Sequence, residues 1–290
     1  MGWLDKLMRS EPEQNPEPTA VTPDEEAPVP EKSPRENIPE SDPETDARPQ
    51  DAGPPPQVDP FLKALEKHGK DIAGALHAVC RRMDYNDDAE VCLAYFKYSF
   101  KVSDEGFERL AEIESLEKLD ITDTAITNEG LKHLATLPKL RDLIVDVTEV
   151  GDDGLECLRE IQTLRRLSLA ATKVSDIGLK HLAGLTQLES LNLSGTNITH
   201  RGLVHLKGLS NLRHLDLSEN EIRDEGLENL KDLSRLEFLS FNDTRVSDQG
   251  IRHFSSFKDL KYFNAKRTFV SDKQIARLIE LMPFCKFNKD

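Results

Sequence analysis

The chain has 290 residues and a formal net charge of −15, with 31% charged and 6% aromatic residues. This charge argues against a nucleic-acid partner, because phosphate binding needs a basic surface. The four cysteines form no CxxC pair or zinc-binding spacing, and no apolar run approaches the ~20 residues of a membrane span. Neither a metal site nor a membrane-spanning helix is therefore expected.

Residues 1–10 form a short segment of their own, in which Trp3, Leu4, Leu7 and Met8 would share one face of a helix. The segment lacks the long apolar stretch of a signal peptide, so a cytoplasmic location is the default expectation. One hypothesis is that this amphipathic peptide contacts a membrane surface or docks on a partner. The other is an unstructured start, because ten residues are too few for a stable isolated helix.

The stretch that follows differs sharply from the rest of the chain. Residues 11–60 hold 14 of the 16 prolines and 14 acidic residues against three basic ones, and they contain no Leu, Met, Phe, Tyr or Trp. Such a segment buries too little apolar surface to offset the entropy lost on ordering. Residues 11–58 are therefore predicted to be a disordered, self-repelling acidic linker rich in proline.

From Asp59 the pattern becomes helical, with Asp59 as a capping residue and Pro60 in the first turn. Apolar residues recur at helical spacing, and Gly69 divides the segment into two short helices, the second from about Lys70 to Met83. The ends of a repeat array need a cover over their core. Residues 59–91 are therefore predicted to form a helical N-terminal cap.

A 24-residue repeat fills the remaining chain, residues 92–290. Apolar residues recur at this step in several columns, and no insertion or deletion interrupts them. One column contains Leu116, Leu140, Leu164, Leu188, Leu212, Leu236 and Leu260. Glycine recurs in step from Gly106 to Gly250, and only Gln274 departs. The register predicts about eight coils and a C-terminal cap, with a degenerate first coil (92–115) in which Lys97 falls at a core position.

Each coil has the consensus LxxLxLxxTxITDxGLxxLxxLxx. The LxLxx part alternates with a period of two and predicts a short strand. The Thr or Asn that follows is expected to hydrogen-bond backbone groups at the corner and to build a polar ladder through the stack. The pairs Ser175-Asp176 and Ser247-Asp248 supply capping oxygens at a helix start. One coil cannot bury its leucines alone, so neighbouring coils should stack their strands into one parallel sheet.

The repeat resembles the leucine-rich-repeat family. Its ITDxGLxxL phrase is most similar to the bacterial 24-residue repeats and to the ribonuclease-inhibitor-like and cysteine-containing (F-box-associated) subclasses, although a Cys stands in the latter where Thr stands here. The resemblance implies an α/β solenoid with a curved parallel sheet on the concave side and short helices on the convex side. It also implies binding to another protein, but members of the family bind very different ligands.

In this family partners often use the concave face, which the outward strand positions would line. These positions are acidic in the first coils, and in the last coils they carry two aromatic residues on one column beside a histidine. The candidate partner-binding residues are His214, Asp216, Phe238, Asn242, Tyr262, Asn264, Asp120, Asp142 and Asp146. Exposed aromatic side chains are the usual anchors of a protein interface. Two alternatives stay open: Phe238 and Tyr262 could merely pack on each other, and the acidic residues could form a solvated face.

Catalysis receives little support from the sequence. His214 beside Asp216 could act as a base and its orienting group, but no Ser or Cys nucleophile sits in an activating motif, and no phosphate-binding glycine loop occurs. We therefore expect a non-catalytic protein-binding scaffold or adaptor, without cofactor or metal. The alternative is a membrane-peripheral tether, anchored by the Trp3 peptide and carrying the solenoid on the acidic linker.

Overall fold

The computed structural model describes residues 59–96 and 102–289. The predicted N-terminal peptide (1–10) and acidic linker (11–58) lie outside the described residues, as does Lys97. The described strands are β1 (Cys80–Tyr85), β2 (Val91–Phe96), β3 (Lys118–Asp120), β4 (Asp142–Ile144), β5 (Arg166–Ser168), β6 (Ser190–Asn192), β7 (His214–Asp216), β8 (Phe238–Ser240), β9 (Tyr262–Asn264) and β10 (Lys286–Asn288). The described helices are α2 (Pro60–His68), α3 (Ile72–Val79), α4 (Asp104–Leu110), α5 (Asn128–Leu134), α6 (Asp152–Leu158), α7 (Asp176–Leu179) and α8 (Asp272–Leu281), with the 3-10 helices η1 (Gly202–Leu206), η2 (Asp224–Leu230) and η3 (Gly250–Ser256).

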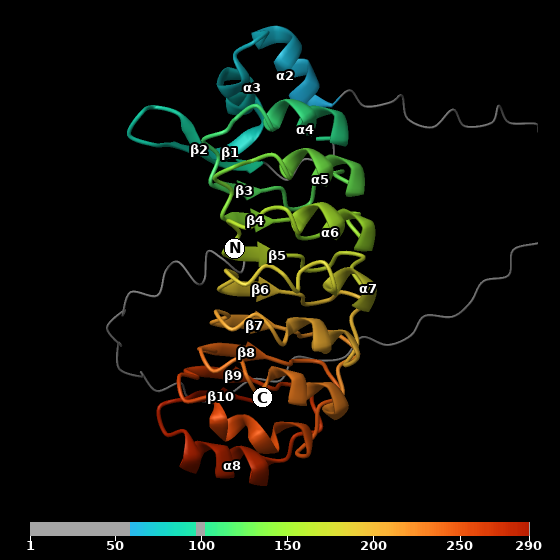
Figure 1. Ribbon diagram of the computed structural model, residues 1–290, viewed down its shortest axis with the longest axis vertical. Coiled ribbons are helices and arrows are strands. Elements are labelled where there is room, and N and C mark those ends of the chain that lie inside the picture. Colours follow the sequence, from blue (N-terminus) through green and yellow to red (C-terminus); the bar gives the residue numbers. More distant parts are fainter. Residues whose placement is uncertain (1–58, 97–101, 290) are drawn as a thin grey trace, which may run out of the picture. The chain divides into compact units, whose positions relative to one another are not determined.

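The strands form one sheet in chain order, and every pair from β2 to β10 is parallel. Figure 1 shows the strands stacked along one side and the short helices along the other. The pairing keeps the 24-residue register, because Leu119 lies opposite Leu143 and Leu143 lies opposite Leu167. The predicted solenoid of stacked coils is therefore confirmed.

Leucine side chains fill the space between the sheet and the helices. Leu116, Leu140 and Leu164 are fully buried, and the column continues in the same way through Leu236. Full burial of a leucine side chain stabilises the folded state by about 1.5–3 kcal/mol. Because neighbouring coils supply much of that burial, the stability of one coil depends on the coils beside it.

The N-terminal cap differs from the prediction in its second half. The second helix ends at Val79, and Cys80–Tyr85 forms β1, which pairs antiparallel with β2. A turn joins the two strands, and in it the Asn86 side chain accepts hydrogen bonds from the backbone N–H groups of Asp88 and Glu90. Without β1, the outer edge of β2 would present unpaired backbone groups. The cap is therefore two helices and a hairpin, and the sheet is not wholly parallel.

The first coil also has a different register from the one implied by a 24-residue step. Ala94, which is fully buried, lies opposite Leu119, and Tyr95 lies opposite Asp120. The step between β2 and β3 is therefore 25 residues. A shift of one residue exchanges the two faces of a strand, which explains why a 24-residue step placed the charged Lys97 at a core position.

The small polar residue at each corner has the predicted role. The hydroxyl of Thr124 donates to the carbonyl of Ile121 at 2.8 Å, and Thr148, Thr172, Thr196, Thr244 and Thr268 make the same contact within their own coils. Within this ladder, Asn220 also makes hydrogen bonds to the preceding coil. Its Nδ2 donates to the Leu193 carbonyl of the preceding coil, and its Oδ1 accepts from the Thr196 hydroxyl.

A carboxylate joins each of several coils to the next, and we call this contact the aspartate clamp. Asp152 accepts hydrogen bonds from the backbone N–H and hydroxyl of Ser175, at 2.7 and 2.6 Å, and from the N–H of Gly178 at 3.0 Å. The same contact to a Ser or Thr joins Asp59 to Ser103, Asp104 to Thr127, Asp176 to Thr199, Asp224 to Ser247 and Asp248 to Ser271. The predicted capping oxygens come from the serines of the two pairs, since the Ser175 hydroxyl accepts from the N–H of Ile177 and the Ser247 hydroxyl from the N–H of Gln249. The carboxylates of Asp176 and Asp248 in addition join their coil to the next.

The clamp also explains the repeated glycine. A Cβ atom at Gly178 would lie 2.5 Å from Oδ1 of Asp152, and one at Gly130 would lie 2.4 Å from Oδ1 of Asp104. Any side chain at these positions would displace the carboxylate that holds the coil in place. The glycine column is therefore required by close approach between coils.

The clamp departs from this pattern at two places within the array. At the first, the side-chain amide oxygen of Asn128 takes the place of the carboxylate and accepts from the backbone N–H of Gly151 at 2.8 Å. At the second, the contact is interrupted. His200 stands where the aspartate of the repeat is expected, and Arg223 stands where its Ser or Thr partner would be. Nδ1 of His200 is buried and has no hydrogen-bond partner among the described residues. Asn220 joins the same two coils through its hydrogen bonds to Leu193 and Thr196, and it lies three residues before Arg223.

The residue three positions after the end of each three-residue strand from β3 to β9, beginning at Asp123, has a left-handed backbone, with φ between +52° and +64°. Its N–H donates to a carbonyl of the next coil, as Val147 does to Ala170 at 2.8 Å. Only Gly195 is a glycine among these positions. The conformation is most costly for a β-branched residue, so Val147 is the most strained member of the row.

Removing one clamp should destabilise the fold. Asp152→Ala leaves the backbone N–H and the hydroxyl of Ser175 without their acceptor, so we expect the free energy of unfolding to fall by about 2–4 kcal/mol, measured by urea titration. Asp153→Ala is the matched control, because Asp153 is exposed and adjacent. Equal losses in the two variants would contradict a special role for the clamp.

Relief of backbone strain should stabilise the fold. Val147→Asn places a residue that tolerates the left-handed region at φ +57°, and we expect a gain of about 1 kcal/mol in unfolding free energy. Val204→Asn is the control, since Val204 is 50% exposed, close to the 52% of Val147, but its φ is not positive. A gain of the same size at both positions would show that strain is not the cause.

Candidate partner-binding surface

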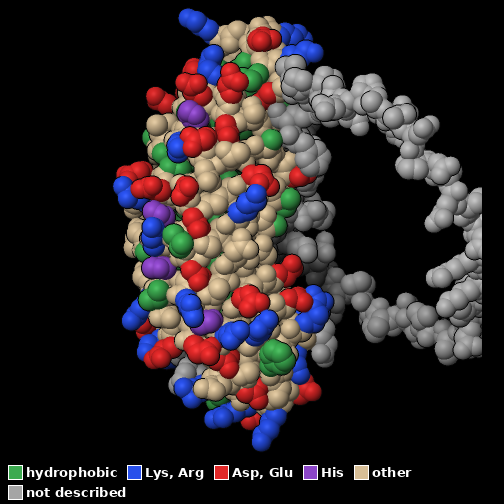
Figure 2. Space-filling view, turned by 90° about the vertical axis from the view of Figure 1, so that its right-hand side faces the viewer, with side chains coloured by type: hydrophobic (Ala, Val, Ile, Leu, Met, Phe, Trp, Pro, Cys, Tyr) green, Lys and Arg blue, Asp and Glu red, His purple; other side chains and the backbone are tan. Residues whose placement is uncertain are grey.

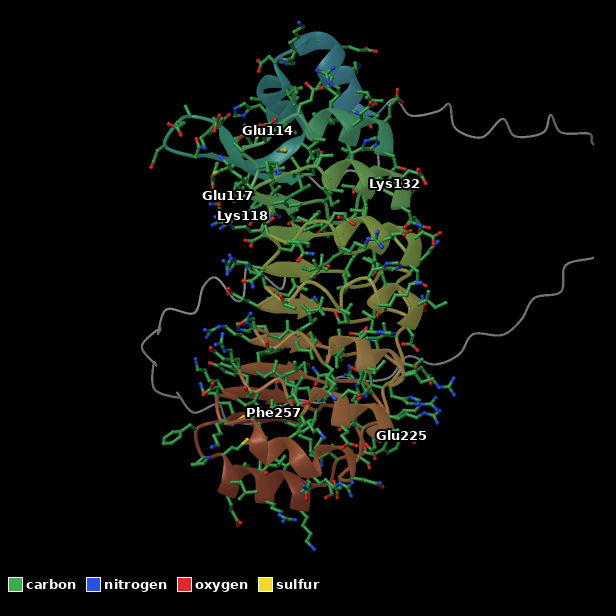
Figure 3. All side chains as sticks on the ribbon, in the orientation of Figure 1. Glu114, Glu117, Lys118, Lys132, Glu225 and Phe257 are labelled. Atoms are coloured by element: carbon green, nitrogen blue, oxygen red, sulfur yellow. The ribbon has the colours of Figure 1, made fainter. Side chains whose placement is uncertain are left out.

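The outward residues of the strands make a surface that we call the strand face. In each strand from β3 to β9 the middle residue points into the core, and the first and third residues point outward. Figure 3 shows Lys118 of β3 on this side of the molecule, whereas Lys132 and Glu225 lie on the helix side. The period-of-two reading therefore assigned the strand residues to the correct face.

Two aromatic residues and a histidine lie side by side at the C-terminal end of the strand face. His214 is opposite Phe238, and Phe238 is opposite Tyr262, in three consecutive strands. The rings of His214 and Phe238 have centroids 6.4 Å apart, and Nζ of Lys286 lies 5.6 Å from the centroid of Tyr262. Tyr262 is 45% exposed, and Phe238 is half-buried. We call His214, Phe238 and Tyr262 the aromatic column.

Burial sets the ionisation of the polar groups in this region. It lowers the pKa of His214, which favours the neutral imidazole at neutral pH, and it raises the pKa of Asp216. Asp216 accepts hydrogen bonds from the N–H and hydroxyl of Ser218, at 3.0 and 2.6 Å. The Asp216 carboxylate is therefore engaged at the end of β7 by Ser218, and no hydrogen bond joins it to His214 within the described part of the chain.

The predicted acidic end is more complex than a row of solvated carboxylates. Asp142 is buried, and both of its oxygens lie 2.9 Å from guanidinium nitrogens of Arg166, with Lys118 at 3.8 Å. Burial raises the pKa of Asp146 to about 6, although it accepts hydrogen bonds from the Ser168 hydroxyl and the Ala170 N–H. The charge of Asp142 is therefore balanced by its basic neighbours, whereas burial disfavours the ionised form of Asp146.

The three remaining candidate residues, Asp120, Asn242 and Asn264, lie in or beside the strands. Oδ1 of Asp120 accepts from the N–H and hydroxyl of Thr122, and Oδ1 of Asn242 accepts from the N–H of Lys266. Asn264 is half-buried at the end of β9. Asp120 and Asn242 thus stabilise the ends of the strands in addition to any role in binding.

Sequence reasoning missed a second surface, at the loop edge next to the left-handed positions. A hollow of about 580 Å³ is lined there by Thr196, Asn197, Ile198, Glu219, Asn220, Glu221, Asp243, Thr244, Arg245, Arg267 and Phe269. Phe269 is 71% exposed, and ion pairs join Arg245 to Glu221 and Arg267 to Asp243. The signal was available, because Phe269 is an aromatic residue in a column that is polar at Glu221 and Arg245.

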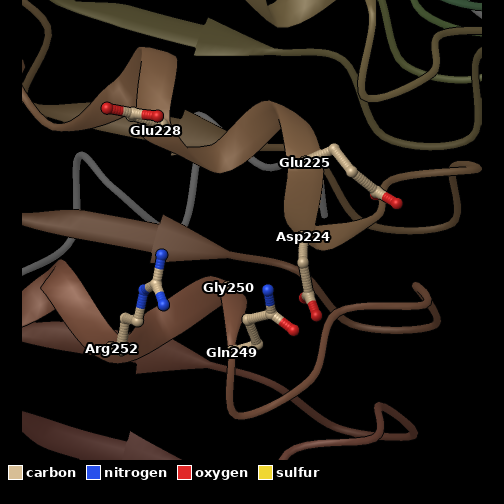
Figure 4. A pocket seen from close by; sticks show the side chains of 6 residues that line it. All are labelled: Asp224, Glu225, Glu228, Gln249, Gly250 and Arg252. Atoms are coloured by element: carbon tan, nitrogen blue, oxygen red, sulfur yellow. The ribbon is translucent and has the colours of Figure 1, made fainter.

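The helix side has a smaller hollow, of about 190 Å³, between η2 and η3. Figure 4 shows the residues that line it, Asp224, Glu225, Glu228, Gln249, Gly250 and Arg252. Asp224 is already held by its clamp to Ser247, and Glu228 pairs with Lys231. Within residues 59–96 and 102–289, no group of three or more His, Cys, Asp or Glu side chains could hold a metal ion, and no helix is long and apolar enough to cross a membrane.

The buried carboxylate of Asp146 predicts a pH dependence. Its pKa rises from 3.8 to about 6 on folding, so its contribution to stability is complete below pH 3.8 and is lost as pH rises through about 6. In Asp146→Asn we expect this loss between pH 4 and pH 7, of about 2–3 kcal/mol, to disappear from unfolding curves. Asp243 should contribute to stability in the opposite direction, because the hydrogen bond from Arg267 lowers its pKa. In Asp243→Asn, a loss of stability that the parent shows as the pH falls should therefore disappear. Parallel profiles for Asp146→Asn and the parent would contradict the assignment.

Comparisons with known proteins agree with this architecture. The structure is similar to internalin C2 of Listeria monocytogenes, with a TM-score of 0.58, 24% identity, and coverage of 79% of this chain and 93% of that one. An internalin F structure from the same species gives a TM-score of 0.51 and 18% identity, over 63% of this chain and 56% of that one. A search of curated protein sequences finds no significant match. The family model for the leucine-rich repeat region matches residues 91–283, and the chain therefore belongs to the leucine-rich-repeat family.

Proposed function

We propose that this chain is a non-catalytic scaffold or adaptor that recognises a protein partner through the strand face of its solenoid. The observation that supports this most strongly is the aromatic column. Tyr262 is exposed, Phe238 is half-buried, and both sit on a rigid sheet beside a largely uncharged imidazole. Rigid aromatic side chains contribute most of the energy at typical protein interfaces, because they bury a large area at little cost in conformational entropy.

The surroundings of the column favour a protein surface as the ligand. The neighbouring strand β6 carries small polar residues, Ser190 and Asn192, on this side of the sheet, although both are buried. Cations flank the other end, where Lys286 lies over Tyr262 and Lys266 follows β9. An apolar centre with a polar and charged rim is the usual composition of a protein interface.

The membrane-peripheral tether and the cytoplasmic location both remain predictions from the sequence. Trp3 and the acidic linker lie outside the described residues. Deleting residues 1–10 and fractionating cells would test the tether, which requires the truncated protein to shift towards the soluble fraction.

The scaffold proposal is tested by removing the aromatic column. Phe238→Ala combined with Tyr262→Ala should abolish capture of the natural partner from native lysate while the fold stays intact, because the two rings would supply the apolar anchors. Capture is measured with the full-length protein as bait, and integrity by circular dichroism and the unfolding midpoint.

Phe269→Ala is the matched control, since it also removes an exposed aromatic side chain, at the loop edge instead of the strand face. The control should capture the partner as well as the parent does. Unchanged capture by a folded double variant would move the binding site away from the strand face.

A further inference from the structure

The outer side of α8 carries apolar and basic side chains together. Ile275 and Leu278 of this helix are buried against the last coil. Lys273, Arg277 and Leu281 recur every four residues and are exposed. Phe284, just beyond the helix, is 94% exposed, and Ile279 is exposed as well. We call Lys273, Arg277, Ile279, Leu281 and Phe284 the end face, because α8 lies at one end of the stack in Figure 1.

The charge of this region is opposite to that of the chain as a whole. Residues 251–290 contain nine Lys and Arg against four Asp and Glu, whereas the whole chain carries −15. Figure 2 shows blue side chains gathered at the end of the stack that contains α8. Two of the four acidic residues are exposed on α8: Asp272, which pairs with Lys289, and Glu280.

The shape of the end face distinguishes between classes of partner. A protein groove receives an apolar side chain, whereas the end face presents one that projects: Phe284 is almost wholly exposed. Neither of the two hollows described above includes a residue of α8. Projecting Phe and Leu beside Lys and Arg are the side chains that enter the boundary between lipid headgroups and acyl chains.

From this arrangement we propose that the end face binds an anionic lipid surface. Lys273 and Arg277 contact the headgroups, and Leu281 and Phe284 enter the interface. Charge orients the molecule, since this end is attracted and the acidic remainder of the chain is repelled. The chain therefore meets the surface with the α8 end, and the strand face stays accessible to a protein partner.

Vesicle co-sedimentation with the full-length protein tests this proposal. Binding is expected to vesicles of phosphatidylcholine with phosphatidylserine and not to phosphatidylcholine alone, and it should weaken as salt is added. Phe284→Ser with Leu281→Ser should reduce binding at least about tenfold, and Lys273→Glu with Arg277→Glu should do the same. All these side chains are exposed, and the unfolding midpoint of each variant shows that the fold is retained.

Two controls separate the end face from other apolar surfaces. Phe269→Ser removes an exposed ring at the loop edge, and Trp3→Ser alters the N-terminal peptide; both should bind vesicles as the parent does. The proposal is overturned if the two α8 variants retain full binding, if Trp3→Ser alone abolishes it, or if binding ignores lipid charge. It is also overturned if the end face captures an acidic protein but no vesicles.

Discussion

Every coil of this solenoid is held against the next by a contact made at a fixed spacing along the chain. From β3 to β10 the parallel strand pairs repeat every 24 residues, and from Asp104 onward the aspartate clamp crosses from one coil to a Ser or Thr 23 residues later. From β3 onward these contacts keep the coil length constant, because an added residue would rotate the leucines away from the core. The absence of insertions between Leu116 and Leu260 follows from this constraint.

The sequence predicted the features that depend on periodicity within a coil. The strands, the buried leucines and the Thr124-type corner bonds follow from spacings of two, three or 24 residues. It did not reveal features that depend on contact between coils. Asp176 lies at a helix start as predicted, but its carboxylate also accepts a hydrogen bond from Thr199 in the next coil. Likewise, β1 forms because the edge of β2 needs a partner, which helical spacing in residues 70–83 could not indicate.

The position of the candidate residues on the sheet could be predicted from the sequence, but the contacts of their side chains could not. Alternation put Phe238 and Tyr262 on the outward face, where the structure has them. The partners of the acidic residues were not foreseen, although Asp142 and Arg166 are 24 residues apart and therefore occupy one column. The carboxylate of Asp142 lies between Lys118 and Arg166 and is paired with these neighbours. Reading columns across coils, as well as positions within them, would have found this ion pair and Phe269.

The interruption of the clamp at His200 has a consequence for how the stack comes apart. A repeat array behaves as a row of units coupled to their nearest neighbours, so it separates first where the coupling is weakest. At this seam Asn220 and the leucine core join the coils without a carboxylate. Partial unfolding would therefore divide the molecule into two cooperative blocks. The C-terminal block contains both the aromatic column and α8, so the two proposed binding surfaces would be lost or kept together.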